Sequence, residues 1–184
     1  MIEDKKRWNE KYLDNPVMGE VSTLVEKYIE HVKIGEALDV ACGTGRNTHF
    51  LAELGFCVDA IDISDYALDK VKNSATINKI DADLDKYNLT PNKYDLIVNI
   101  NYLNRRLVSQ MKESLKSGGV VIFETFMVAH GDFKMPTTNL DYLLRKNELL
   151  HSFIGLDVIY YEEKIDTNFK GERIKIASIV AKKS

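Results

Sequence analysis

The chain is poor in the features that would take it out of the ordinary globular proteins. Its 184 residues include only two cysteines, three prolines and one tryptophan, and the formal net charge is −3. Two cysteines cannot build a disulfide framework, and a chain without excess positive charge is a poor partner for nucleic acid. No apolar run approaches the roughly 20 residues of a membrane-spanning helix, so we expect no membrane association. The first residues are charged and precede no apolar segment, so we expect no signal peptide and a cytoplasmic location.

What is present is the composition of a globular domain. Apolar residues make up 45% of the chain and charged residues 29%, which are ordinary values for such proteins. The length suits one domain, and neither a linker nor a repeat interrupts it, so residues 1–184 are predicted to fold as a single unit. Cys42 and Cys57 sit in apolar runs and are expected to be small buried hydrophobes. The quaternary state is left open between monomer and homodimer.

From residue 20 onward, segments of strand character alternate with segments of helical period. The predicted strands are Glu36–Ala41, Phe56–Ile61, Thr76–Asp81, Tyr94–Ile100, Val120–Phe126, Leu156–Tyr161 and Arg173–Ala181. The predicted helices are Glu20–Val32, Arg46–Leu54, Tyr66–Val71, Leu103–Leu115 and Leu140–Phe153. This alternation predicts a mainly parallel sheet with both faces covered. The last two strands must pair antiparallel, because Glu162–Glu172 is too short to hold a crossover helix.

A glycine-containing turn follows the first predicted strand. Glu36–Ala41 runs into Cys42-Gly43-Thr44-Gly45 and then into a helix, and ligands of parallel sheets bind beyond the carboxyl ends of the strands. Gly43 and Gly45 permit a tight turn and a close approach of a ligand. Asp62 ends the next strand, where a carboxylate can accept hydrogen bonds from both hydroxyls of a ribose. The set indicates an adenosine cofactor; the alternative is a turn that merely joins a strand to a helix.

The residues around the turn favour S-adenosyl-L-methionine (SAM) over a dinucleotide. A dinucleotide site has a third glycine where this chain has Thr48, and Arg46 and Asn47 crowd the start of the helix. Asp39 lies within the strand, just below the turn. A carboxylate there suits the sulfonium and the amino group of SAM and would repel a pyrophosphate. A nucleotide-dependent oxidoreductase is the disfavoured alternative.

These segments resemble a known family. Leu38–Gly45 is similar to the first motif of class I SAM-dependent methyltransferases, although Ala41 stands where many members have glycine. Asp62-Ile63-Ser64 resembles the ribose-binding acid of that family, and Asp81-Ala82-Asp83-Leu84 resembles its adenine-flanking segment. The similarity extends over nearly the whole chain. Trp8–Tyr12 resembles the first helix of the small tellurite-resistance and thiopurine-methyltransferase-like branches.

The resemblance implies a Rossmann-like α/β fold, with a seven-stranded, mostly parallel sheet of order 3-2-1-4-5-7-6, helices on both faces and a C-terminal antiparallel hairpin. It also implies methyl transfer from SAM to a small-molecule acceptor, with S-adenosyl-L-homocysteine (SAH) as product; a non-catalytic SAM-binding regulatory module is the alternative. Residues 1–33 are expected to form a helical segment covering the site, although a merely docked helix fits Trp8–Tyr12 equally well. The residues expected to contact the cofactor are Asp39, Ala41, Gly43, Gly45, Arg46, Asp62, Ile63, Ala82, Asp83, Leu84 and Asn99.

The methyl acceptor is expected above the ends of the fourth and fifth strands. In-line displacement at a sulfonium needs alignment more than a dedicated acid or base. Asn101, Tyr102 and Arg105 are candidates for this wall, and His130 in the predicted loop Met127–Asn139 is a candidate general base. Each has a plainer interpretation: Asn101 can cap a helix, while Arg105 and His130 can simply be solvated.

Two further features limit the chemistry. Asn99-Ile100-Asn101-Tyr102 invites comparison with the Asn-Pro-Pro-Tyr motif of enzymes that methylate amino groups of nucleic acids, but it lacks both prolines, so base methylation is disfavoured. The histidines have no Cys, Asp or Glu at metal-ligand spacing, and we predict no metal.

Glu124 is a polar residue in an apolar strand; it either faces the site or is held by a salt bridge or an N–H group.

Overall fold

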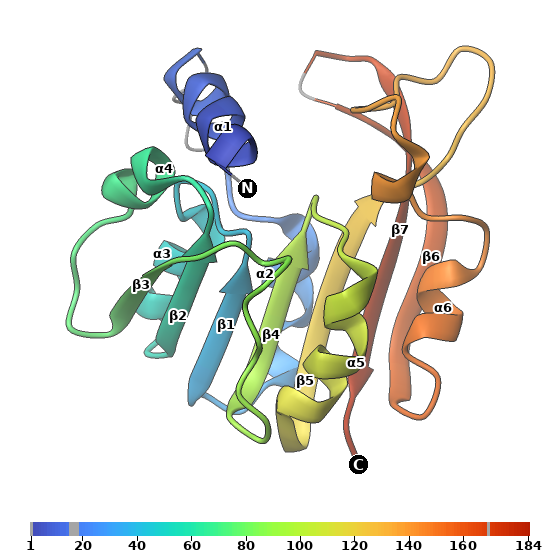
Figure 1. The fold of residues 1–184 in the computed structure, drawn as a ribbon. Coiled ribbons are helices and arrows are strands. Elements are labelled where there is room, and N and C mark those ends of the chain that lie inside the picture. Colours follow the sequence, from blue (N-terminus) through green and yellow to red (C-terminus); the bar gives the residue numbers. More distant parts are fainter. Residues whose placement is uncertain (1, 15–18, 169) are drawn as a thin grey trace.

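The apolar segments predicted from the sequence assemble into one sheet. The computed structural model describes residues 2–14, 19–168 and 170–184 and is drawn in Figure 1. The strands are β1 (Glu36–Val40), β2 (Cys57–Asp62), β3 (Ile77–Asp81), β4 (Tyr94–Ile100), β5 (Leu115–Phe126), β6 (Asp157–Thr167) and β7 (Arg173–Lys182). Their order is β3-β2-β1-β4-β5-β7-β6, and β7 runs antiparallel to both of its neighbours. The predicted order and the C-terminal hairpin are confirmed.

Helices cover both faces of the sheet, as predicted. They are α1 (Ile2–Asp14), α2 (Thr23–Tyr28), α3 (Arg46–Glu53), α4 (Asp65–Lys70), α5 (Arg105–Ser114) and α6 (Glu148–Ser152), with 3-10 turns η1 (Ile29–His31) and η2 (Leu140–Tyr142). Successive residues of a strand point to opposite faces. Leu38 of β1 accordingly packs in a core with α5 and α6, while Ala37 packs in a second core with α2 and α3. Leu68 and Val71, on and just after α4, form a small third core with Ala60 of β2.

The strand order reverses its direction beside β1. β2 pairs with one edge of β1 and β4 with the other, and the chain leaves both β1 and β4 at the same end of the sheet. A crevice forms at such a reversal, and this is where open α/β sheets bind their ligands. Figure 1 shows α1 lying across this end of the sheet, next to α4. Residues 1 and 15–18 of the predicted N-terminal segment 1–33 lie outside the described residues.

The predicted helix Leu140–Phe153 is wrong over most of its length. Only η2 and the five-residue α6 are helical. Between them, Leu144 pairs with the chain that continues β5: its N–H donates to the Phe126 carbonyl and its carbonyl accepts from Val128 N–H, each at 2.9 Å. This pairing fixes the backbone of Leu144 as an extended segment, so a tertiary contact overrides the helical periodicity of the sequence.

Three smaller expectations also need correction. The predicted helix Glu20–Val32 begins only at Thr23 and tightens into a 3-10 turn at its end. The predicted strand Val120–Phe126 begins five residues earlier, at Leu115, with a bulge before Val120 where the register with β4 shifts. Cys57 is exposed, because it is the first residue of β2 at the edge of the core, whereas Cys42 is buried as predicted. In the described part of the chain, no helix combines the length and apolar character needed to span a membrane.

Candidate functional site

The turn after β1 adopts a backbone that favours glycine. Ala41, Gly43 and Gly45 have φ values of 52°, 56° and 84°, a left-handed region that residues with a side chain enter at a cost. A Cβ atom built on Gly43 would lie 2.6 Å from the hydroxyl oxygen of Tyr12 on α1. The backbone conformation therefore favours glycine at position 43, and a larger residue would also displace the Tyr12 side chain.

Asp62 joins this turn to the start of α4. Its Oδ2 accepts a hydrogen bond from Gly43 N–H at 2.8 Å, and its Oδ1 accepts from Ser64 N–H at 2.9 Å. The residue is 5% exposed, and this burial raises the pKa of its carboxyl group despite the backbone donors. A carboxylate has about four lone-pair positions, so the fixed group can still accept a hydrogen bond from a ligand beside these backbone donors. Ile63 follows directly and is half-buried.

Asp39 is held by the helix that follows the turn. The hydroxyl of Thr48 donates to Asp39 Oδ2 at 2.6 Å, and burial raises the pKa of the Asp39 carboxyl to about 6. Thr48 thus has a structural use at the position where a dinucleotide site would have its third glycine. Arg46 points elsewhere: its guanidinium donates to the Glu20 carbonyl at 3.1 Å and holds the segment that leads into α2.

The segment after β3 is fixed from two sides. Ala82 N–H donates to the Asp62 carbonyl at 3.0 Å, and Asp83 Oδ1 accepts from Asp85 N–H at 3.0 Å. The carbonyl of Leu84 accepts from the guanidinium of Arg106 on α5 at 2.7 Å. The side chain of Leu84 is buried in the core, with Ala82 packed against the same cluster. A partly buried apolar residue, Ala82, next to the carboxylate of Asp83 suits the ring and the exocyclic amine of adenine.

The end of β4 carries an unpaired polar atom. Asn99 is fully buried, and its Nδ2 donates to the Tyr102 carbonyl at 2.7 Å. Its Oδ1 has no hydrogen-bond partner among the described residues, a state that costs free energy in a protein interior. Asn101 is exposed with a φ of 62°, and its N–H donates to the Glu124 carbonyl. The Tyr102 hydroxyl lies with Asn104, on the side of the adenine-flanking segment.

Arg105 holds the segment that follows β5. Its guanidinium forms an ion pair with Glu148, in which Nε lies 2.6 Å from Oε1, and donates to the carbonyls of Leu143 and Asp141. The pKa of the Glu148 carboxyl is lowered, because its hydrogen bonds from Arg105 and Arg145 N–H outweigh its desolvation. Arg105 is therefore occupied by its own chain, and a direct role with the acceptor stays a prediction.

The other two candidates beyond β5 are placed differently. His130 is exposed on the loop between Met127 and η2, so its role as a general base also stays a prediction. Glu124 is partly buried, and its Oε2 accepts a hydrogen bond from the Ser178 hydroxyl at 2.6 Å. The partner of Glu124 is thus a neighbouring strand's hydroxyl, neither the salt bridge nor the N–H group considered from the sequence.

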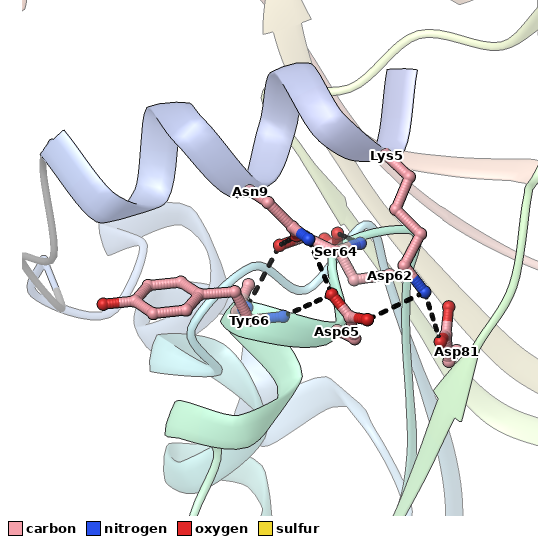
Figure 2. Close-up of polar contacts among 8 residues, drawn as sticks. Lys5, Asn9, Asp62, Ser64, Asp65, Tyr66 and Asp81 are labelled. Atoms are coloured by element: carbon pink, nitrogen blue, oxygen red, sulfur yellow. Dashed lines mark hydrogen bonds and ion pairs between the residues drawn. The ribbon is translucent and has the colours of Figure 1, made fainter. Parts of the chain in front are cut away.

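Sequence reasoning missed the polar face of α1. Lys5, Asn9 and Tyr12 are spaced i, i+4 and i+7, so they share one face of the helix. Asn9 bonds to Ser64 and Asp65, and Lys5 pairs with Asp65 and Asp81 (Figure 2). The signal was present in this spacing, but nothing in the sequence identified the surface that this face meets. Within residues 2–14, 19–168 and 170–184, no three His, Cys, Asp or Glu side chains gather closely enough to hold a metal ion.

Comparison with known proteins agrees with this geometry. Residues 1–180 match the family described as tellurite resistance protein TehB. The chain is 27% identical, over 194 aligned positions, to the probable S-adenosyl-L-methionine-dependent methyltransferase TehB of Haemophilus influenzae, covering 96% of this chain and 65% of that protein. The chain therefore spans about two thirds of the length of this curated relative.

Solved structures show the same fold. The crystal structure of TehB from Haemophilus influenzae superposes with a TM-score of 0.76 at 22% identity, covering 96% of this chain and 67% of that one. The [4+2]-cyclase SpnF superposes with a TM-score of 0.67 at 15% identity, over 87% of this chain and 78% of that one. Likeness at this level establishes the fold and leaves the reaction open, as the name of the second protein illustrates. The match over residues 1–180 settles the family: the chain belongs to the TehB family of class I SAM-dependent methyltransferases.

Proposed function

We propose that this chain transfers the methyl group of SAM to a small-molecule acceptor by in-line displacement, releasing SAH. The observation that carries the proposal is Asp62, a buried carboxylate at the end of β2 whose two oxygens are fixed by Gly43 N–H and Ser64 N–H. This arrangement supports a ribose with both hydroxyls on Asp62. Gly43 has no Cβ to block close approach of the rest of the cofactor, once the Tyr12 hydroxyl that lies against it moves aside.

The remaining cofactor contacts follow from neighbouring strand ends. Ala82 and Leu84 are proposed to flank the adenine ring, with Asp83 accepting from its amine. Gly43 and Gly45 are proposed to lie against the methionine part, where Asp39 and the unpaired Oδ1 of Asn99 supply acceptors for an ammonium group. Ala41, Arg46 and Ile63 complete the expected contacts as backbone and packing neighbours of the turn.

The protein's main contribution to this reaction is to orient SAM and the acceptor. SAM supplies an electrophilic methyl group, whose bond to sulfur breaks as the bond to the acceptor nucleophile forms; the sulfonium becomes a thioether and the nucleophile's proton passes to water. Asn101 and Tyr102 are proposed to align the acceptor beyond β4, and Arg105 to hold the loop segment opposite them. Fixing both partners in line can lower the barrier by several kcal/mol, about 7–11 in the best intramolecular systems.

Binding and turnover together test the proposal. Titration calorimetry of the chain with SAM, SAH and NAD is expected to show binding of the first two and none of the third. Incubation with SAM labelled in its methyl group and a panel of amines, thiols, hydroxyl compounds and tellurite then separates an enzyme from a regulatory module. Binding of NAD in place of SAH would overturn the cofactor assignment. SAH binding with no labelled product from any acceptor class would support the regulatory module.

A further inference from the structure

An ion-pair cluster ties α1 to the ends of two strands. The Lys5 ammonium lies 2.6 Å from Asp81 Oδ2 and 3.1 Å from Asp65 Oδ2. Asp81 ends β3 and pairs in register with Asp62 of β2, while Asp65 opens α4. The pKa of Lys5 is raised, chiefly by its hydrogen bond to Asp81. Figure 2 shows the side chain reaching down from the helix to both carboxylates.

A second set of contacts links α1 to the proposed ribose carboxylate through one residue. Asn9 Nδ2 donates to Asp65 Oδ1 at 2.7 Å, and Asn9 Oδ1 accepts from the Ser64 hydroxyl at 2.6 Å (Figure 2). The N–H of the same Ser64 donates to Asp62 Oδ1, and its hydroxyl caps α4 by accepting from Ala67 N–H. The side chain of Asn9 is thus separated from Asp62 by Ser64 alone.

These contacts hold α1 across the path by which a nucleoside would reach Asp62. Tyr12 lies against Gly43, as the 2.6 Å separation between its hydroxyl oxygen and a Cβ on Gly43 shows, and Asp62 is only 5% exposed beneath the helix. A ribose that reaches both oxygens of Asp62 therefore requires α1 to part from Ser64 and from the turn. A bound nucleoside would in turn be enclosed when the helix returns.

We propose that Lys5 and Asn9 are positioning residues that latch α1 over the cofactor and that breaking this latch limits release of SAH. The inference rests on the proposed function, since it takes the ligand enclosed by α1 to be SAM or SAH. Neither residue touches the reacting atoms. Both act by holding the helix against Asp65, Asp81 and Ser64.

The chain carries its own reporter of the latch. Trp8 is the only tryptophan and lies on α1 between Lys5 and Asn9 in sequence. Its ring stands 6.0 Å from that of Tyr12, with the Lys11 ammonium 4.1 Å above it. Both of these partners lie on α1 itself, but Trp8 is only partly exposed, so movement of α1 is expected to change the exposure of the ring and with it the tryptophan fluorescence.

The test compares two lysines of the same helix. Lys6 makes only a 3.9 Å pair with Glu10 of α1 and is 77% exposed, so Lys6→Gln is a matched control for Lys5→Gln. Labelled SAH is bound and chased with excess unlabelled SAH, loss of the label is measured by rapid filtration, and Trp8 fluorescence after stopped-flow dilution into ligand-free buffer reports the opening of α1. Exposed ion pairs are individually weak, and loss of the two that Lys5 makes is expected to speed SAH release about five-fold. Asn9→Ala is expected to speed it by a similar factor, and Lys6→Gln to leave it unchanged.

Salt separates the latch from a general loss of packing. Raising the salt from about 0.05 M to about 0.5 M screens the Lys5 pairs and is expected to speed release from the wild-type chain but not from Lys5→Gln. Equal release rates for Lys5→Gln, Asn9→Ala and Lys6→Gln would overturn the latch. Failure of the wild-type chain to bind SAH at all would instead overturn the proposed function, so the two failures are distinguishable.

Discussion

The two halves of the crevice are built in different ways. On the cofactor side, at the ends of β1 to β3, backbone N–H groups fix the proposed ribose carboxylate: Asp62 accepts from Gly43 in the turn and from Ser64 two residues on. On the acceptor side, beyond β4 and β5, the wall is held by side chains far apart in sequence, such as Arg105 with Glu148. The unpaired Asn99 Oδ1, proposed to accept from the ammonium group of the cofactor, lies at the end of β4 between the two halves.

The difference follows from what each half is proposed to bind. The cofactor is the same for every acceptor, so one turn and its neighbouring strand ends can bind it. Such a site has a local sequence pattern and can be recognised as a motif. A variable acceptor is met by loops that return from distant parts of the chain, and these carry specificity on the same scaffold. The comparison predicts that changes in the cofactor half abolish binding, whereas changes in the acceptor half alter turnover.

The largest effect is expected from Gly43→Ala. The new Cβ would sit 2.6 Å from the Tyr12 hydroxyl oxygen at a φ of 56°, so the Tyr12 side chain, α1 or the turn must move. We expect SAH affinity to fall by more than about 100-fold, or about 2.7 kcal/mol. Gly155→Ala is the control, because Gly155 has a φ of 94° but open space around it. Wild-type SAH affinity in Gly43→Ala, measured by calorimetry, would refute the described packing of the turn.

Asp39→Asn is expected to stabilise the ligand-free chain. The pKa of Asp39 is about 6 in the fold, above its ordinary value of 3.8, so the folded chain binds the proton more tightly than the unfolded one. The free energy of unfolding therefore falls as pH rises from about 4 to about 6, and it stays lower at higher pH. Removing the charge should recover roughly 3 kcal/mol at neutral pH.

Urea unfolding of Asp39→Asn and wild type at several pH values measures this effect. The variant is expected to lose the downward slope between about pH 4 and pH 6, while Asp69→Asn on the exposed side of α4 keeps it. If the free energy of unfolding had the same pH dependence in Asp39→Asn and wild type, folding would not raise the pKa of Asp39.

Two adjacent arginines give the sharpest contrast between the halves. Arg105 grips Glu148 and two carbonyls of the acceptor loop, whereas Arg106 grips the Leu84 and Tyr87 carbonyls of the adenine-flanking segment. Lysine cannot reproduce these forked contacts. Each substitution is expected to cost about 1 kcal/mol of stability, since both side chains are partly exposed.

The two variants should differ in their effect on SAH binding. Arg106→Lys is expected to weaken SAH binding a few-fold, and Arg105→Lys to leave it unchanged while speeding amide hydrogen exchange around Leu143 and Leu144. Identical effects of the two variants on SAH affinity would contradict the division of the crevice into two halves.

The smallest effect is expected at the cysteines. Cys57 is exposed at the edge of β2, so Cys57→Ser should change the free energy of unfolding by less than about 0.5 kcal/mol. Burial raises the pKa of the Cys42 thiol well above its ordinary value. A thiol reagent should therefore modify one cysteine quickly in the native chain and the second only after unfolding. Rapid modification of Cys57→Ser would show that Cys42 is open to solvent.

What could be predicted from the sequence follows the same division. The strands and the turn from Leu38 to Gly45 were readable because continuous apolar runs and two closely spaced glycines encode them locally, whereas the strand order came from the resemblance to a known family. The segment 140–153 was not, because Leu144 is fixed by pairing with the continuation of β5, a contact that periodicity does not record. The role of Arg105 with Glu148 and the docking face of α1 were hidden for the same reason.

The most direct test of the central claim is SAH titration of Asp62→Asn. In the wild-type chain, the Asp62 carboxylate is proposed to accept both ribose hydroxyls, and hydrogen bonds to a charged group contribute about 1.5–3 kcal/mol each. For variants shown to be folded by their melting transitions, we predict at least about 100-fold weaker SAH binding for Asp62→Asn and wild-type binding for Asp69→Asn. Unchanged SAH affinity in folded Asp62→Asn would contradict the proposed ribose site.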